Sequence, residues 1–163
     1  VAGWPAAAAL RTWQVDRGLT LSGEQAAAVR RLTTAGHAVE AMVGVAGAGK
    51  TTIMDAARTV WQDAGLTVAG AATAAVAAQT LHAEAGIASR TIARLRLDIT
   101  QGRGIGADVL VVDEAAMVDD RDLAAIVAAA AREQAKVDAE RSLAGPSAAP
   151  VRRRRRTTEE AVE

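Results

Sequence analysis

Residues 44–52 combine the residue types and spacing best suited to chemistry in this chain. They read Gly-Val-Ala-Gly-Ala-Gly-Lys-Thr-Thr and fit G-x-x-x-x-G-K-[ST], the pattern of a loop that wraps around phosphate groups. Glycine lets the backbone turn tightly and bring its N–H groups close to phosphate oxygens. A helix that starts at the end of the loop directs its partial positive charge at the same anion. The segment therefore predicts a nucleotide site.

Within this loop, Lys50 adds a full positive charge near the β- and γ-phosphates, and the Thr51 hydroxyl is a predicted Mg²⁺ ligand. The cofactors expected from the motif are ATP and Mg²⁺. The predicted nucleotide-contacting residues of the loop are Gly44, Gly47, Gly49, Lys50, Thr51 and Thr52.

Two carboxylates at the end of an apolar run form the second candidate half of this site. The run 108–113 reads as a strand and finishes in Asp113, followed by Glu114. Beside a phosphate-binding loop, Asp113 is expected to complete the Mg²⁺ shell with Thr51, and Glu114 to orient or deprotonate the attacking water. The alternative is an ordinary strand that runs into a polar turn.

Gln25 has two interpretations. The spacing Ser22-x-x-Gln25 fits a capping box, in which Gln25 accepts a hydrogen bond from the Ser22 N–H. In many helicases a glutamine at this place, ahead of the phosphate loop, recognises the edge of adenine. The bare sequence leaves both roles open.

The elements needed to position these residues alternate between helix and strand, which predicts a parallel sheet covered by helices on both sides. Gly18, Gly36, Gly65 and Gly86 separate the elements. The expected helices are 4–13, 22–32 with Ser22 as N-cap, 52–64, 71–84, 91–101 and 123–141, and the expected strands are 39–45, 66–70 and 108–113.

Composition limits the remaining choices. The chain has 163 residues, no Cys, Phe or Tyr and three Trp, and about a quarter of it is alanine, so we expect a thin core and no thiolate metal site. No apolar run is long enough to cross a bilayer and no secretory signal is evident, so a cytoplasmic location is expected. Five of the nineteen basic residues are Arg152–Arg156, leaving fourteen against nineteen acidic residues elsewhere. The globular part is therefore not a basic nucleic-acid binder in bulk.

The order and spacing of five segments, 21–29, 43–52, 68–81, 86–95 and 111–118, carry a family resemblance. Over residues 19–137 the chain resembles the first RecA-like domain of a superfamily 1 DNA helicase. It is most similar to the helicase part of MobF-type conjugative relaxases. The resemblance implies an α/β P-loop NTPase fold.

The resemblance also implies functional roles. In the intact family, ATP hydrolysis drives translocation along single-stranded DNA. Gln25 would match the adenine-reading glutamine. Residues 70–73 and the neighbourhood of Thr91 would match DNA-contacting motifs.

The chain also departs from the family pattern. A Gly-Asp-x-x-Gln-Leu segment is expected soon after Val137 and is absent, as are a second RecA-like domain and the tyrosine that relaxase chemistry needs. We therefore expect an N-terminal segment (1–18), a truncated ATP-binding domain (19–141) that hydrolyses ATP slowly at most, and a disordered basic tail (142–163) whose arginine run has no assigned role. The alternatives are a non-catalytic remnant and a small P-loop NTPase of another class.

Overall fold

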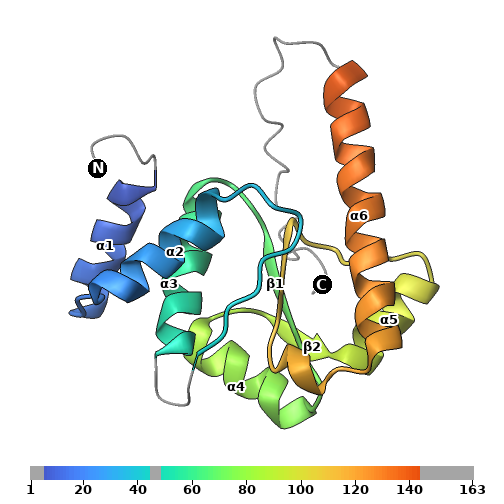
Figure 1. Ribbon diagram of the computed structural model, residues 1–163, viewed down its shortest axis with the longest axis horizontal. Coiled ribbons are helices and arrows are strands. Elements are labelled where there is room, and N and C mark those ends of the chain that lie inside the picture. Colours follow the sequence, from blue (N-terminus) through green and yellow to red (C-terminus); the bar gives the residue numbers. More distant parts are fainter. Residues whose placement is uncertain (1–5, 45–48, 144–163) are drawn as a thin grey trace, which may run out of the picture.

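A parallel sheet of three strands lies at the centre of the molecule (Figure 1). The computed structural model describes residues 6–44 and 49–143. The strand order is β2-β1-β3, so β1 is the middle strand. The three strands are β1 (Val68–Ala72), β2 (Ser89–Thr91) and β3 (Val109–Val112). In the middle of the sheet, Gly70 lies opposite Ser89 on one side and opposite Val111 on the other.

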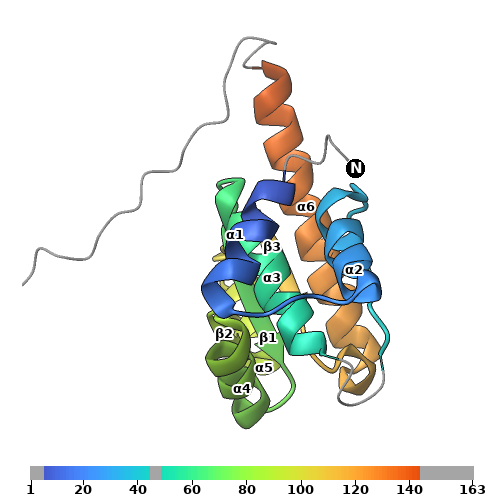
Figure 2. The ribbon, with the colours of Figure 1, turned by 90° about the vertical axis from the view of Figure 1, so that its left-hand side faces the viewer.

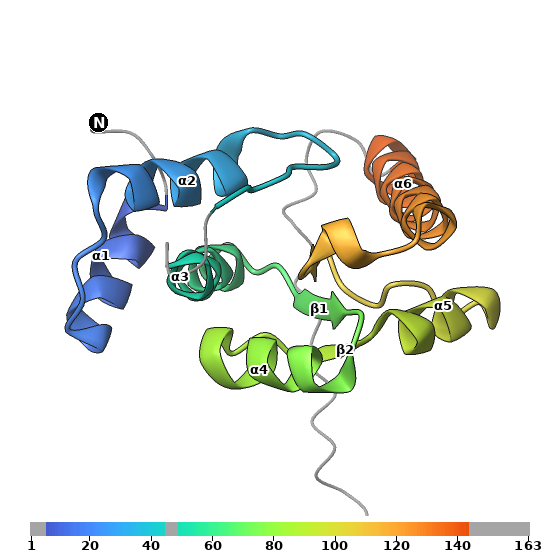
Figure 3. The same cartoon turned by 60° about the horizontal axis from the view of Figure 1, so that its bottom comes forward.

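Helices cover both faces of this sheet, as the alternating pattern predicts. Figure 3 shows α3 and α4 on one side, with α1 and α2 stacked outside α3, and α5 and α6 on the other side. The helices of the described residues are α1 (Ala7–Arg17), α2 (Gly23–Thr34), α3 (Lys50–Asp63), α4 (Ala75–Ala85), α5 (Ile92–Thr100), the short 3-10 helix η1 (Ala115–Met117) and α6 (Asp120–Leu143).

The alternation of side chains along β3 divides the core between the two faces. Val109 and Val111 pack against the cluster built by α1, α2 and α3, whereas Leu110 and Val112 pack against the cluster built by α5 and α6. Successive side chains of a strand point to opposite faces, so one apolar run serves both layers. All four residues of β3 are half-buried, with apolar packing on both faces of the strand. Their partial exposure arises because β3 is the edge strand of the described sheet.

The strand expected over residues 39–45 is not present in the part of it that the structure describes. Residues 39–44 are extended but belong to no sheet ladder, and Val45 lies outside the described residues. Met42 packs against the core cluster of α1 to α3, yet Val39 is 60% and Val43 98% exposed. An apolar run becomes a strand only when a neighbouring strand satisfies its N–H and C=O groups, and residues 39–44 form no such pairing.

Glycine and serine set several helix ends as the sequence predicts. The Ser22 side chain accepts a hydrogen bond from the Gln25 N–H, and the Gln25 side chain accepts one from the Ser22 N–H, which completes the capping box of α2. Gly18 and Gly86 take the left-handed conformation that closes α1 and α4. The capping interpretation of Gln25 is confirmed.

Other boundaries differ from the expectation. β1 begins two residues later than predicted and takes in Ala71 and Ala72, which had been assigned to the following helix. β2 was missed altogether, because Ser-Arg-Thr carries no apolar run. α6 begins at Asp120, where Asp119 Oδ1 accepts a hydrogen bond from the Arg121 N–H at 2.8 Å. Of the expected tail, only the last residues of α6 lie within the described part of the chain.

Candidate nucleotide site

The described part of the phosphate loop ends in a helix, as the motif requires. Gly49 has φ 74° and ψ 29°, a left-handed conformation that suits glycine, and α3 begins at the next residue, Lys50. The first bond of the helix runs from the Ile53 N–H to the Gly49 carbonyl oxygen at 2.9 Å. Lys50 Nζ donates to the Gly44 carbonyl oxygen at 2.7 Å, across the loop. Gly47 lies in 45–48, outside the described residues.

The first turn of α3 presents the groups that an anion would meet. Thr51 and Thr52 are half-buried and Lys50 is exposed. No acidic residue occupies this turn, so the positive end of the helix dipole is not neutralised within it. The turn can therefore accept phosphate oxygens through its N–H groups and hydroxyls.

Gln25 lies against the end of the loop. A Cβ added to Gly49 would come within 2.5 Å of Gln25 Nε2, so the close approach of Gln25 is a second reason for glycine at this position. The capping carbonyl of Gln25 is bound to Ser22, while its amide nitrogen faces the loop. The α2 cap thus positions Gln25 beside the candidate phosphate site.

The acidic pair directly follows β3. The Asp113 N–H donates to the Ala71 carbonyl oxygen at 2.9 Å, which fixes the residue to the end of β1. Asp113 Oδ1 accepts a hydrogen bond from the Glu114 N–H at 2.9 Å. Glu114 has φ 50° and ψ 42° and directly precedes η1, and it is the one non-glycine residue of the described chain with positive φ. Such strain persists where the surrounding structure imposes it and is frequent at functional sites.

Figure 1 shows the beginning of α3 and the end of β3, the yellow-orange strand that leads towards α6, at the same edge of the sheet. This is the carboxyl edge, since all three strands are parallel. Open α/β sheets bind ligands at this edge, because strand ends and helix N-termini meet there. The fold therefore brings Lys50 and Thr51 to the same edge as Asp113 and Glu114.

The two segments implied in DNA contact also end at this edge. Gly70, within β1, has a packing reason to be glycine, because a Cβ there would lie 2.1 Å from Ser89 Oγ and 2.9 Å from Leu81 Cδ2. Thr73 follows β1 and is exposed. Thr91 is the N-cap of α5, and its hydroxyl oxygen accepts a hydrogen bond from the Arg94 N–H at 3.2 Å.

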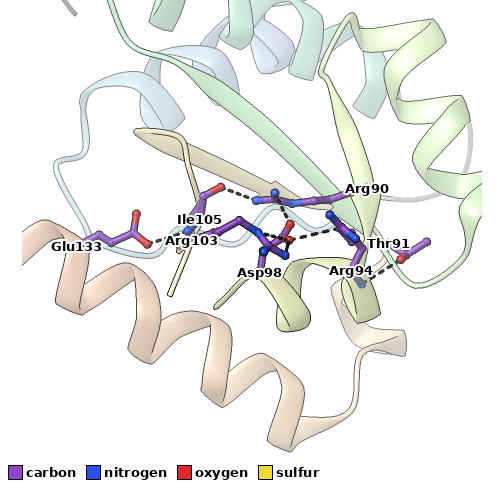
Figure 4. A network of polar contacts seen from close by, with 7 residues as sticks. All are labelled: Arg90, Thr91, Arg94, Asp98, Arg103, Ile105 and Glu133. Carbon is purple, nitrogen blue, oxygen red and sulfur yellow. Dashed lines mark hydrogen bonds and ion pairs between the residues drawn. The ribbon is translucent and has the colours of Figure 1, made fainter. Parts of the chain in front are cut away.

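A cluster of arginines around Asp98, drawn in Figure 4, escaped the sequence analysis. Asp98 is 4% exposed and faces three guanidinium groups. Its Oδ2 lies 2.8 Å from Arg90 Nη1, and its Oδ1 lies 2.9 Å from Arg103 Nε and 3.3 Å from Arg94 Nε. The hydrogen bond from Arg103, with the charges of Arg94 and Arg90, holds the pKa of Asp98 below its ordinary value against the opposing effect of burial. The i, i+4 pair Arg94 and Asp98 is the signal that could have revealed this cluster.

The Asp98 cluster ties β2 and α5 to the loop before β3. Arg90 also donates to the Ile105 carbonyl oxygen, and the Ile105 N–H donates to Glu133 Oε1 of α6 at 2.7 Å (Figure 4). A cavity of about 300 Å³ lies beside Arg90, between α4 and β2. It is lined by Ala75, Ala78, Gln79, His82, Ser89, Arg90 and Thr91.

The fold and the motif geometry agree with the comparisons to known proteins. Residues 20–139 match the family described as AAA domain. The chain belongs to the AAA domain family. This AAA domain is 47% identical over 120 residues to the conjugal transfer protein TraA of Rhizobium radiobacter and 46% identical over 120 residues to the protein of the same name from Agrobacterium fabrum.

Each alignment covers 72% of this AAA domain chain and 11% of the relative, so the chain spans about a ninth of the length of the curated relatives it matches. The resemblance of residues 19–137 to the P-loop domain of conjugative relaxase-helicases is confirmed by the family match and by these relatives. Among the described helices of the AAA domain, none has the length and apolar character needed to cross a bilayer.

Proposed function

We propose that this AAA domain binds Mg·ATP at the carboxyl edge of its sheet and serves as the first motor domain of a conjugative DNA helicase. The observation that carries the proposal is the start of α3 at Lys50, directly after the left-handed Gly49, at the sheet edge where Asp113 follows the end of β3. The shared sheet edge of these two segments supports the proposal that they form the two halves of a P-loop ATP site.

Each predicted residue has a role in this proposal. The loop glycines and the first turn of α3 hold the phosphates, and Lys50 neutralises the β- and γ-phosphates. Thr51 and Asp113 hold Mg²⁺, and Glu114 orients the attacking water or accepts its proton. The amide nitrogen of Gln25 lies beside Gly49, which supports the role in recognising the adenine edge that the resemblance implies.

The proposed nucleic-acid partner is single-stranded DNA. Support comes from the relatives, which are conjugal transfer proteins, and from the cationic side chains of Arg90 and Arg94 beside Thr91. Phosphate groups are attracted to such a cluster in a salt-dependent way. Because the chain spans a ninth of these relatives, we propose that translocation requires further domains of a longer protein, including a second motor domain.

Thermal unfolding with and without Mg·ATP tests nucleotide binding. A ligand at 100 times its dissociation constant stabilises the folded state by about 2.7 kcal/mol, which raises the midpoint of unfolding. Lys50→Ala is expected to abolish the rise. Lys136→Ala is the matched control, since Lys136 is the other lysine of the chain and lies exposed on α6.

The same melts distinguish the proposed nucleotide site from its alternatives. An unchanged midpoint at millimolar Mg·ATP for a folded wild-type chain would favour the non-catalytic remnant. An equal rise in the Lys50→Ala variant would place the nucleotide elsewhere and contradict the proposed site.

A further inference from the structure

Asp98 binds the guanidinium groups of Arg90 and Arg94 in different ways, and the difference decides which of the two can meet a ligand (Figure 4). Arg90 donates from Nη1 to Asp98 Oδ2 at 2.8 Å and from Nη2 to the Ile105 carbonyl oxygen. Its Nε is buried without a hydrogen-bond partner among the described residues. Arg90 is therefore a fixed cation whose two terminal nitrogens are already bound within the protein.

Arg94 keeps both of its terminal nitrogens for a ligand. Its side chain is 59% exposed and meets Asp98 Oδ1 through Nε, at 3.3 Å. Within the part of the chain that the structure describes, neither Nη1 nor Nη2 of Arg94 makes a hydrogen bond. A guanidinium that is held at Nε can still donate from both terminal nitrogens to two oxygens of one phosphate group.

The start of α5 places the Arg94 guanidinium in a region of positive potential. Arg94 lies in the first turn of the helix, and its N–H donates to the hydroxyl oxygen of the N-cap residue Thr91 at 3.2 Å. No acidic residue occupies this turn, so the positive end of the helix dipole adds to the charge of Arg94. The neighbourhood of Thr91 is also where the proposed function places single-stranded DNA.

The buried carboxylate is what keeps Arg94 in this position. Arg90, Arg94 and Arg103 bring three positive charges to the one negative charge of Asp98. Without that carboxylate the three guanidinium groups repel one another, and the long, exposed side chain of Arg94 regains its rotamer freedom. A side chain that must be ordered on binding contributes less affinity than one that is already in place.

We propose that Asp98 is a positioning residue for DNA binding, which holds the Arg94 guanidinium beside Thr91 so that Arg94 binds a phosphate group of single-stranded DNA. The inference rests on the proposed function, and Asp98 itself does not touch the DNA. A carboxylate near DNA ordinarily weakens binding, because it repels phosphate. The positioning role therefore predicts an effect opposite in sign to that of charge alone.

Fluorescence anisotropy of a labelled oligothymidylate with the full chain at low salt tests this role, at a temperature where each variant is folded by circular dichroism. Asp98→Asn adds one unit of positive charge, yet it is expected to lower the affinity about tenfold, as the loss of one charge-assisted contact does. The slope of log affinity against log salt is expected to fall by about 0.7, the contribution of one phosphate on a single strand.

The matched control is Asp122→Asn, which makes the same change in a carboxylate that pairs with another arginine of α5, Arg96. Its affinity for the oligothymidylate is expected to equal or exceed that of the wild type, because only the charge effect operates there. An equal loss of affinity in this control would overturn the positioning role.

A double-mutant cycle separates positioning from a general structural effect. Arg94→Ala is expected to lower the affinity about tenfold, and adding Asp98→Asn to it is expected to cause no further loss. Arg94→Lys keeps the charge at an exposed position, but an ammonium cannot bind Asp98 and two phosphate oxygens in the geometry of the guanidinium fork. It is therefore expected to lose affinity as well, and it decides the proposal if Asp98→Asn does not fold.

The outcomes distinguish this inference from the proposed function. Higher affinity in Asp98→Asn, an additive loss in the double variant or wild-type affinity in Arg94→Lys would overturn the positioning role and leave DNA binding standing. A folded wild type that does not bind the oligothymidylate would overturn both the positioning role and the proposed DNA partner.

Discussion

Asp98 is almost enclosed by protein but remains surrounded by positive charge. Three guanidinium groups compensate the loss of water around the carboxylate, and two of those arginines remain half or more exposed. Removing the negative charge would leave Arg90, Arg94 and Arg103 facing one another. The Asp98 carboxylate therefore helps to hold the loop before β3 against β2 and α5, through its ion pairs with Arg103, Arg90 and Arg94.

This arrangement predicts an acid-dependent loss of stability. The pKa of Asp98 is lowered in the folded state from an ordinary value of 3.8. The carboxylate therefore stabilises the fold fully above pH 3.8, and this contribution is lost as the pH falls through the lowered folded pKa. Asp98→Asn is expected to lower the melting midpoint at pH 7 and to flatten its fall below pH 4.

Thermal melts by circular dichroism across pH 3 to 7 measure both effects. Asp63→Asn is the control, since Asp63 is exposed at the end of α3. A variant that follows the wild-type pH profile in parallel would show that Asp98 does not contribute in this way.

At the scale of elements, the contact between β1, β2 and α4 depends on a missing side chain. Gly70 lies opposite Ser89, and Leu81 of α4 covers the same spot. A Cβ at position 70 would meet both Ser89 of β2 and Leu81 of α4. Glycine therefore allows β2 and α4 to approach β1 closely at this point.

Gly70→Ala is therefore expected to destabilise the fold by about 1–3 kcal/mol, as overpacked cores do. The added Cβ would lie 2.1 Å from Ser89 Oγ and 3.0 Å from Ser89 Cβ. Gly23→Ala is the control: nothing lies within 4 Å of a Cβ there, and stability should stay within about 1 kcal/mol or rise. Urea denaturation measures both variants, and equal midpoints for the two would contradict the packing argument.

At the scale of the whole molecule, three core clusters pack on the two faces of one three-stranded sheet, and the candidate ATP site lies at the edge of this sheet. Figure 2 shows α1 and α2 flanking α3. In the proposed motor, this domain holds the phosphates at the edge of its sheet, and a second domain supplies an arginine from the opposite side of the nucleotide. Such an arginine is worth about 10³–10⁵ in rate.

This chain by itself is therefore expected to bind Mg·ATP but to hydrolyse it very slowly. Release of labelled phosphate should be near background and should fall further in Glu114→Gln, with Mg·ATP affinity retained. Fast turnover that rises on addition of single-stranded DNA would show that the chain needs no second domain.

The sequence predicted the caps of α1, α2 and α4 and the parallel character of the sheet, because these depend on local features. A capping box, a C-terminal glycine and an apolar run each act within a few residues. Hence Ser22, Gly18 and Gly86 were predicted correctly, whereas α3 starts at Lys50, two residues earlier than expected.

Only the tertiary structure decided which runs became strands and which charges met. The segment 39–44 and β3 both carry apolar residues, yet only β3 joins the ladder of the described sheet, while the polar segment 89–91 becomes a strand because it pairs with β1. Asp55 and Asp98 likewise bind partners from other elements: α1 for Asp55, and β2 and the loop before β3 for Asp98. Hydrogen bonds and ion pairs between distant residues depend on proximity in space, which spacing along a chain does not contain.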